Sequence, residues 1–111
     1  MEGIGIDPDL KSALTLPVDS GLLVTRVYRG TTAEAAGIQG ASEVAILFNR
    51  RILAGGDIIT DIDGKPINSM DDMDLLLESK RPGETVRMTY YRGRTKNQKS
   101  IVLMEQPKRY R

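Results

Sequence analysis

Short runs of alternating apolar and polar residues make up most of this chain, and glycine, proline and aspartate separate them. The clearest run is residues 54–67, in which three isoleucines within five residues indicate a buried strand. Asp63-Gly64 predicts a tight turn, because glycine accepts positive φ and aspartate bonds to its own backbone. Pro66 donates no hydrogen bond, so the short return piece after the turn belongs at a sheet edge.

A helix is predicted next, from near Ser69 to about Lys80. Asn68 or Ser69 can cap it, three aspartates suit its positive N-terminal end, and Pro82-Gly83 ends it. One narrow arc at helical spacing is apolar; it holds Met70, Met73 and Leu77, with Leu76 beside it and Leu75 nearly opposite. Such a stripe most often packs into a core, but methionine also suits a surface that must accept varied apolar partners.

The remaining pattern predicts a strand at 3–6, a helix at 7–14, a strand at 22–28, a helix at 33–36, and hairpins at 43–53 and 84–104. We place the turn of the first hairpin at Asn49-Arg50, with Phe48 near its tip. An exposed apolar tip would be a docking feature. We expect instead that this hairpin packs as extra cover for the core.

The composition of the chain limits the kinds of partner that it could bind. The chain has 111 residues, enough for one domain, and its 16 basic residues nearly balance 15 acidic ones, so no overall field favours nucleic acid or a membrane. Arg92, Arg94 and Lys96 beside two tyrosines suggest RNA contact only weakly, and we interpret residues 92–97 as a solvated hairpin loop.

Several kinds of site are excluded by missing residue types. Cysteine and histidine are absent, which excludes disulfides, Ser-His-Asp and Cys-His catalysis and most zinc sites. We therefore expect no catalytic residue, no metal and no cofactor. No apolar run approaches the roughly 20 residues that span a bilayer, and no signal peptide is visible.

The order of these elements, with Gly-Ile-Gly-Ile at 3–6, Gly-Thr-Thr-Ala-Glu-Ala-Ala-Gly-Ile at 30–38 and Gly-Gly-Asp-Ile-Ile through Ile67, resembles a PDZ domain. The resemblance is to the type that follows the protease domain in HtrA/Deg-family trypsin-like serine proteases. It implies an α+β fold: a small, partly open antiparallel β-barrel or sandwich of five to six strands, capped by two main helices. Residues 1–106 would form the domain and 107–111 a basic tail or linker. A hairpin insertion at about 42–53 departs from the shortest members.

The resemblance also implies a binding site for the C-terminus of a peptide, which adds as a strand to a sheet edge. Its carboxylate would be held by the backbone N–H groups of Gly3, Ile4, Gly5 and Ile6. Its last apolar side chain would enter a pocket whose expected walls are Ile4, Ile6, Met73 and Leu77, followed by Met70 and Leu76. A helix turned by one residue, centred on Asp72 and Leu76, would instead place a carboxylate at the groove mouth.

The partners implied by the resemblance are C-termini of unfolded or signalling proteins and an attached protease domain, which the module would supply with substrate or regulate. The isolated domain would be monomeric, and its parent a trimer or larger. The location would be periplasmic or otherwise extracytoplasmic, with a membrane anchor as one option. A scaffold or adaptor PDZ domain of another membrane-associated or processing protease is the alternative.

Two further hypotheses rest on aspartates. Asp19-Ser20-Gly21 resembles the motif of dimeric aspartic proteases, but it precedes a strand as an ordinary turn does. Asp61 and Asp63 suggest a calcium loop, but alignment on Gly64 leaves the first and last ligand positions without carboxylates. We therefore expect neither proteolysis nor metal binding from them.

Overall fold

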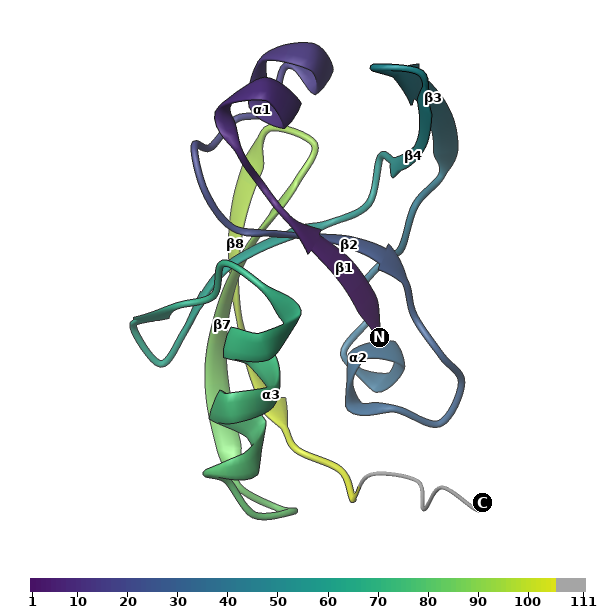
Figure 1. Cartoon of the computed structure of the whole chain (residues 1–111). Helices are drawn as coiled ribbons and strands as arrows, with labels where there is room; N and C mark the ends of the chain where they lie inside the picture. Colours follow the sequence, from purple (N-terminus) through teal and green to yellow (C-terminus); the bar gives the residue numbers. More distant parts are fainter. Residues whose placement is uncertain (106–111) are drawn as a thin grey trace.

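A six-stranded antiparallel sheet forms the centre of the structure, a computed structural model that describes residues 1–105 (Figure 1). Within these residues the elements are β1 (Glu2–Gly5), α1 (Pro8–Leu14), β2 (Leu22–Arg26), α2 (Thr32–Ala35), β3 (Glu43–Leu47), β4 (Arg50–Ala54), β5 (Ile58–Ile62), β6 (Lys65–Pro66), α3 (Met70–Glu78), β7 (Thr85–Arg92) and β8 (Thr95–Val102). The predicted tail at 107–111 lies outside the described residues.

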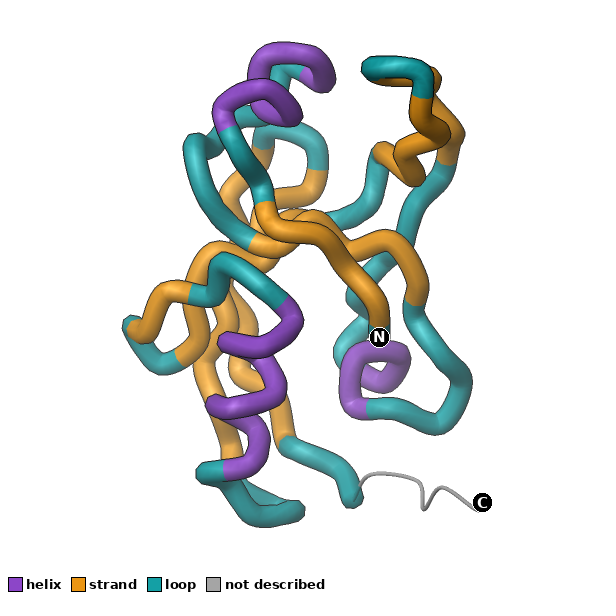
Figure 2. The backbone as a smooth tube through the Cα atoms, viewed as in Figure 1, coloured by secondary structure: helices purple, strands orange, loops and turns teal. Residues whose placement is uncertain are grey.

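The sheet is open, because its strand order β1-β2-β5-β7-β8 leaves β1 and β8 at opposite edges, with β6 paired to β5. Strands β3 and β4 form a separate hairpin that projects away from the sheet (Figure 2). The α+β class and the partly open antiparallel sheet are confirmed. The described chain has eight strands and three helices. The helix predicted at 7–14, the hairpin predicted at 43–53 and the short return piece after Asp63-Gly64 are all present, as α1, β3–β4 and β6.

Two apolar clusters pack on the strands because successive side chains of a strand point to opposite faces. Leu22 and Val24 belong to the larger cluster, which α2 and α3 cover, and Leu23 between them belongs to the smaller one. The larger cluster also contains Ile59, Ile62, Ile67, Met73, Leu76, Val86, Met88 and Tyr90. The smaller cluster joins Leu10 of α1 to Ile58, with Leu47 and Ile52 of the hairpin packed against it.

The predicted Asp63-Gly64 turn and the predicted serine cap of α3 are both present. Asp63 and Gly64 both have positive φ, of 52° and 78°, and connect β5 to β6 as a tight turn. The Ser69 side chain accepts the N–H of Asp72 and caps α3. The helix ends at Glu78, two residues earlier than expected.

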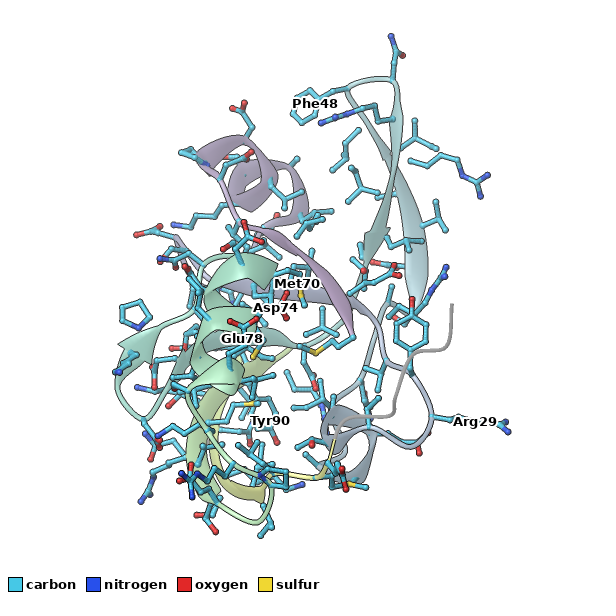
Figure 3. All side chains as sticks on the ribbon, turned by 60° about the horizontal axis from the view of Figure 1, so that its bottom comes forward. Arg29, Phe48, Met70, Asp74, Glu78 and Tyr90 are labelled. Carbon is cyan, nitrogen blue, oxygen red and sulfur yellow. The ribbon has the colours of Figure 1, made fainter. Side chains whose placement is uncertain are left out.

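The hairpin β3–β4 differs from the prediction in two ways. Its turn is Phe48-Asn49, where both residues have positive φ, rather than Asn49-Arg50. Only one face packs: Ile46 and Phe48 remain 68% and 66% exposed, and Phe48 lies at the outer end of the hairpin (Figure 3). The expectation that this hairpin simply covers the core is therefore wrong for its outer face.

The second hairpin has a two-residue turn, because Arg92 pairs with Thr95 and already belongs to β7. The Arg92 guanidinium donates Nε to Oδ1 and Nη2 to Oδ2 of Asp57, at 2.9 and 2.8 Å. This bond to the buried Asp57 raises the pKa of Arg92. Nη2 also donates to the carbonyl of Gly37 at 2.8 Å. Arg92 therefore fastens β7 to the start of β5 and the end of α2 and is not a free cation of the loop.

Candidate functional site

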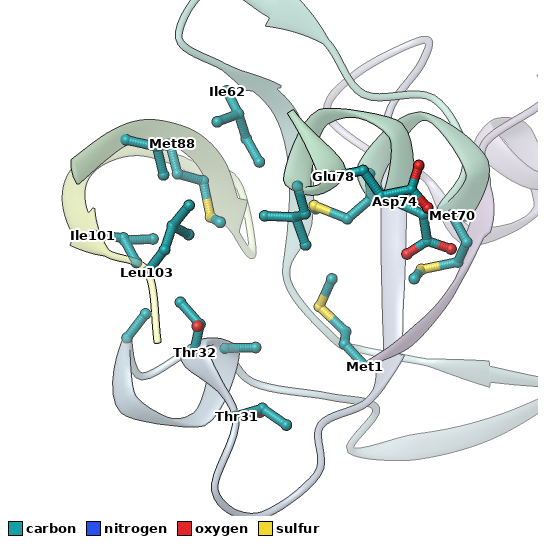
Figure 4. Close-up of a pocket in the computed structure, with 15 residues that line it drawn as sticks. Met1, Thr31, Thr32, Ile62, Met70, Asp74, Glu78, Met88, Ile101 and Leu103 are labelled. Atoms are coloured by element: carbon teal, nitrogen blue, oxygen red, sulfur yellow. The ribbon is translucent and has the colours of Figure 1, made fainter. Parts of the chain in front are cut away.

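A cavity of about 610 Å³ lies between α3, α2 and the inner face of β5, β7 and β8. Helix α3 contributes Met70, Met73, Asp74, Leu77 and Glu78 to its lining. The opposite walls are Thr31, Thr32, Ala33 and Ala36 near α2 and Ile62, Val86, Met88, Ile101 and Leu103 from the sheet side, and Met1 points into the space between (Figure 4). The lining is thus mostly apolar.

Helical periodicity explains which residues of α3 reach this cavity. Met70, Asp74 and Leu77 are spaced by four and three residues, so they share one face. Leu76 is buried in the larger cluster and does not line the cavity. The Asp72 carboxylate accepts the Asn68 N–H at 2.9 Å at the start of the helix. The helix phase centred on Asp72 and Leu76 is therefore wrong for this cavity, and the carboxylates at its rim are those of Asp74 and Glu78.

Strand β1 is the sheet edge nearest this helix. The Ile6 N–H donates to the Gly21 carbonyl at 3.0 Å, opposite β2. Hydrogen-bonded pairs alternate along an antiparallel ladder, so this register indicates that Ile4 and Leu23 form a hydrogen-bonded pair and that the backbone groups of Gly3 and Gly5 face the free edge. A register shift lies next to Gly3, between Glu2 and Gly3. The four N–H groups at 3–6 thus alternate in direction along a strand and do not converge as the predicted loop would require.

The glycines of β1 are also needed for close packing. A Cβ on Gly5 would lie 2.5 Å from the Asn68 carbonyl oxygen just before α3. A Cβ on Gly3 would lie 2.8 Å from the Leu23 carbonyl oxygen. Glycine at these positions lets the edge strand, its neighbour and the start of α3 approach one another.

Of the predicted pocket walls, the cavity brings together Met70, Met73 and Leu77. Ile4 and Ile6 alternate with the glycines, and Ile6 packs against the smaller cluster with Leu10 and Leu23. Neither isoleucine lines the cavity. Their role in contacting a peptide stays a prediction.

Asp74 and Glu78 line the cavity, although the sequence analysis does not predict them as site residues. The signal was present, since both lie at helical spacing from Met70 and Leu77. The sequence analysis assigns three aspartates, Asp71, Asp72 and Asp74, to the positive N-terminal end of the helix, but only Asp71 and Asp72 lie in its first turn.

The structure gives ordinary structural roles to Asp19 and Asp63, two of the aspartates on which the alternative hypotheses rest. The Asp19 side chain is 86% exposed and forms an ion pair with Lys11 at the surface, so it does not lie in the apolar corner that an aspartic protease requires. Asp63 accepts the Arg87 N–H at 2.8 Å within the turn, and this bond lowers its pKa.

Within residues 1–105 no helix is long and apolar enough to cross a membrane.

An open antiparallel sheet with a free edge strand beside an amphipathic helix defines a class of small α+β domain with an edge groove. Residues 3–103 match the PDZ domain family, and the chain belongs to that family. PDZ domains are non-catalytic peptide-binding modules.

Two relatives are proteases. The periplasmic pH-dependent serine endoprotease DegQ of Escherichia coli K12 is 27% identical over 93 residues, 84% of this chain and 17% of that protein. A probable periplasmic serine endoprotease DegP-like of Rhizobium meliloti 1021 is 28% identical over 94 residues, 82% of this chain and 16% of that protein. The chain thus spans about a sixth of the length of these relatives.

Proposed function

We propose that this domain binds the C-terminal segment of a polypeptide as an added strand along β1, with an apolar side chain in the cavity. One observation carries the proposal: the free edge of β1 lies beside a largely apolar cavity walled by α3. The polar backbone groups of Gly3 and Gly5 supply main-chain hydrogen bonds that do not depend on the peptide sequence.

We propose that the peptide runs antiparallel to β1, which is the arrangement of every strand pair in this sheet. A peptide antiparallel to β1 places its C-terminal end near Gly3 and its upstream residues near Gly5. The carboxylate then lies beside the segment Gly3–Ile6, where Gly3 and Gly5 are the donors that β2 leaves free. This orientation brings the last side chain toward Met73 and Leu77, since Met1 at the same end of β1 lines the cavity with them.

The expected affinity is modest. Burying one Leu or Phe side chain contributes about 1.5–3 kcal/mol, and a few net main-chain hydrogen bonds add about 1 kcal/mol each. Ordering the peptide opposes these terms. A micromolar complex, about −8 kcal/mol, suits weak and reversible capture.

Titration of the ¹⁵N-labelled domain with short peptides tests this function by NMR. Shifts are expected at residues 3–6 and 70–77 for the free acid and much less for the C-terminal amide. Leu77→Arg blocks the cavity and should abolish binding, whereas Leu75→Arg, at a position 66% exposed, should not. Both variants are checked for an unchanged fold by circular dichroism. Equal response to acid and amide would exclude carboxylate capture, and binding by folded Leu77→Arg would exclude the cavity.

We further propose that the parent is a periplasmic, oligomeric serine protease, and that this module delivers substrates to the attached protease domain or regulates it. The two relatives, both described as periplasmic serine endoproteases, support a periplasmic serine protease as the parent and favour it over an adaptor of another processing enzyme. A His…Asp…Gly-x-Ser-Gly pattern upstream in the full-length chain is expected. Peptides that bind the domain should change the rate at which the full-length protein cleaves a reporter substrate; no change would refute the regulatory role.

A further inference from the structure

We propose that Met70 is a site of oxidation by peroxide, and that the sulfoxide formed there closes the cavity to apolar side chains. This rests on the proposed peptide binding. Four of the five methionines of the chain, Met1, Met70, Met73 and Met88, line this one cavity (Figure 4). Because cysteine is absent, methionine thioethers are the sulfur groups on which an oxidant can act.

The four methionines differ in how easily an oxidant reaches them. Met73 and Met88 are only 3% and 7% exposed, whereas Met1 and Met70 are half-buried. A cavity of about 610 Å³ easily admits hydrogen peroxide, a molecule little larger than water. Met70 also shares one face of α3 with Met73 and Leu77, at spacings of three and four residues. It is therefore the accessible thioether of the wall that would contact the last side chain of the peptide.

The reaction transfers one oxygen atom to sulfur. A lone pair on the Met70 Sδ attacks one oxygen of hydrogen peroxide, the O–O bond breaks and an S–O bond forms. The departing hydroxide takes the proton of the transferred oxygen, so the products are the sulfoxide and water. The sulfur loses two electrons and the peroxide gains them. Methionine sulfoxide reductases reverse the change, so the site can be switched back.

A sulfoxide suits an occupied cavity poorly. Its oxygen is a strong acceptor, and ionised carboxylates such as those of Asp74 and Glu78 have no hydrogen to donate. The Thr31 hydroxyl already donates to the Tyr28 carbonyl at 2.7 Å. Water solvates the sulfoxide while the cavity is empty, but a bound apolar side chain displaces that water and leaves the oxygen unpaired. We therefore expect peptide affinity to fall about 10- to 100-fold with the fold intact.

The test treats the whole chain with limiting hydrogen peroxide and maps the sulfoxides by mass spectrometry. Anisotropy titrations use a fluorescent peptide that ends in a free leucine carboxylate. Domain carrying sulfoxide at Met70 is expected to bind about 10- to 100-fold more weakly with an unchanged circular dichroism spectrum. Sulfoxide reductases for both epimers should restore binding. Excess peptide during the treatment should slow oxidation of Met70 and leave the rate at Met104, outside the cavity lining, unchanged.

Two variants locate the effect, and each is compared with itself before and after treatment. Met70→Leu keeps an apolar side chain of similar volume that peroxide does not oxidise, so it should lose most of the sensitivity. The matched control is Met104→Leu, at a position 42% exposed, which should remain as sensitive as the unmodified domain.

Three results would overturn the inference and leave the proposed peptide binding intact. They are a Met70 that stays unmodified while Met104 is oxidised, unchanged binding by domain with sulfoxide at Met70, and equal sensitivity of Met70→Leu. Unfolding on oxidation would also overturn it, because the loss of binding would then not arise in the cavity. If the untreated domain binds no peptide, the proposed function itself fails.

Discussion

Replacing Asp57 by alanine is expected to destabilise the domain by about 2–4 kcal/mol. The Asp57 side chain is 2% exposed and accepts two bonds from Arg92 and one, at 2.9 Å, from the N–H of Gln39. Charge-assisted hydrogen bonds contribute about 1.5–3 kcal/mol each, but the Arg92 side chain is 43% exposed, so water replaces part of the contacts that its guanidinium loses. We therefore place the loss below the 3–5 kcal/mol typical of a fully buried pair.

This loss is measurable by urea and thermal unfolding followed by circular dichroism. An unfolding entropy of about 2.1 cal/mol/K per residue gives roughly 0.23 kcal/mol/K for a chain of 111 residues. A loss of 2–4 kcal/mol then lowers the melting temperature by about 9–17 °C. A double-mutant cycle with Arg92→Met should show coupling of about 2 kcal/mol, because the second substitution removes a bond that the first has already broken.

The control is the surface pair of Lys11 and Asp19, where Asp19→Ala should cost less than about 1 kcal/mol because the carboxylate is almost fully exposed. If Asp57→Ala were as mild as Asp19→Ala, or if the effects of Asp57→Ala and Arg92→Met were additive, the reasoning that this pair joins β5, β7 and α2 would be refuted.

Three further predictions concern backbone geometry and acid stability. Phe48→Gly should raise stability by up to about 1 kcal/mol in urea unfolding, because Phe48 has φ of 52° and is exposed; a loss would show that its ring packs. Gly5→Ala should cost about 1–3 kcal/mol and weaken peptide binding, because the new Cβ meets the Asn68 carbonyl; normal melting would contradict this. The folded pKa of Asp63 is lowered from 3.8 by the Arg87 N–H, so its contribution is present above about pH 5 and lost as pH falls through the folded pKa. The melting-temperature deficit of Asp63→Asn should therefore shrink from pH 7 to pH 3, and a constant deficit would exclude the mechanism.

The segment around α3 could be predicted because its determinants are local. Asp63-Gly64 requires positive φ wherever it lies, and a serine before an aspartate-rich apolar stripe caps a helix in most contexts. The apolar arc of α3 also predicted three cavity residues, Met70, Met73 and Leu77, since helical spacing alone places them on one side.

The other side of the groove depends on contacts between distant segments. Strand alternation places Ile4 and Ile6 on one face of β1, but the sequence does not state which face meets α3. The choice is made by Gly5, whose missing Cβ leaves room for Asn68, 63 residues further along the chain. The pairing of Asp57 with Arg92 also joins residues far apart in the chain, 35 positions, and the sequence around Arg92 shows only a basic residue next to a hairpin turn, which is typical of a solvated side chain.

The way β1 is held bears on how the domain would bind. Its inner edge is bonded to β2, Ile6 continues the ladder to Gly21, and Gly5 contacts the start of α3. An edge strand fixed at these points needs little further ordering when a peptide is added, so the entropy cost falls mainly on the peptide. Substitutions that loosen β1 without touching the cavity, such as Gly5→Ala, should then weaken every peptide by a similar factor.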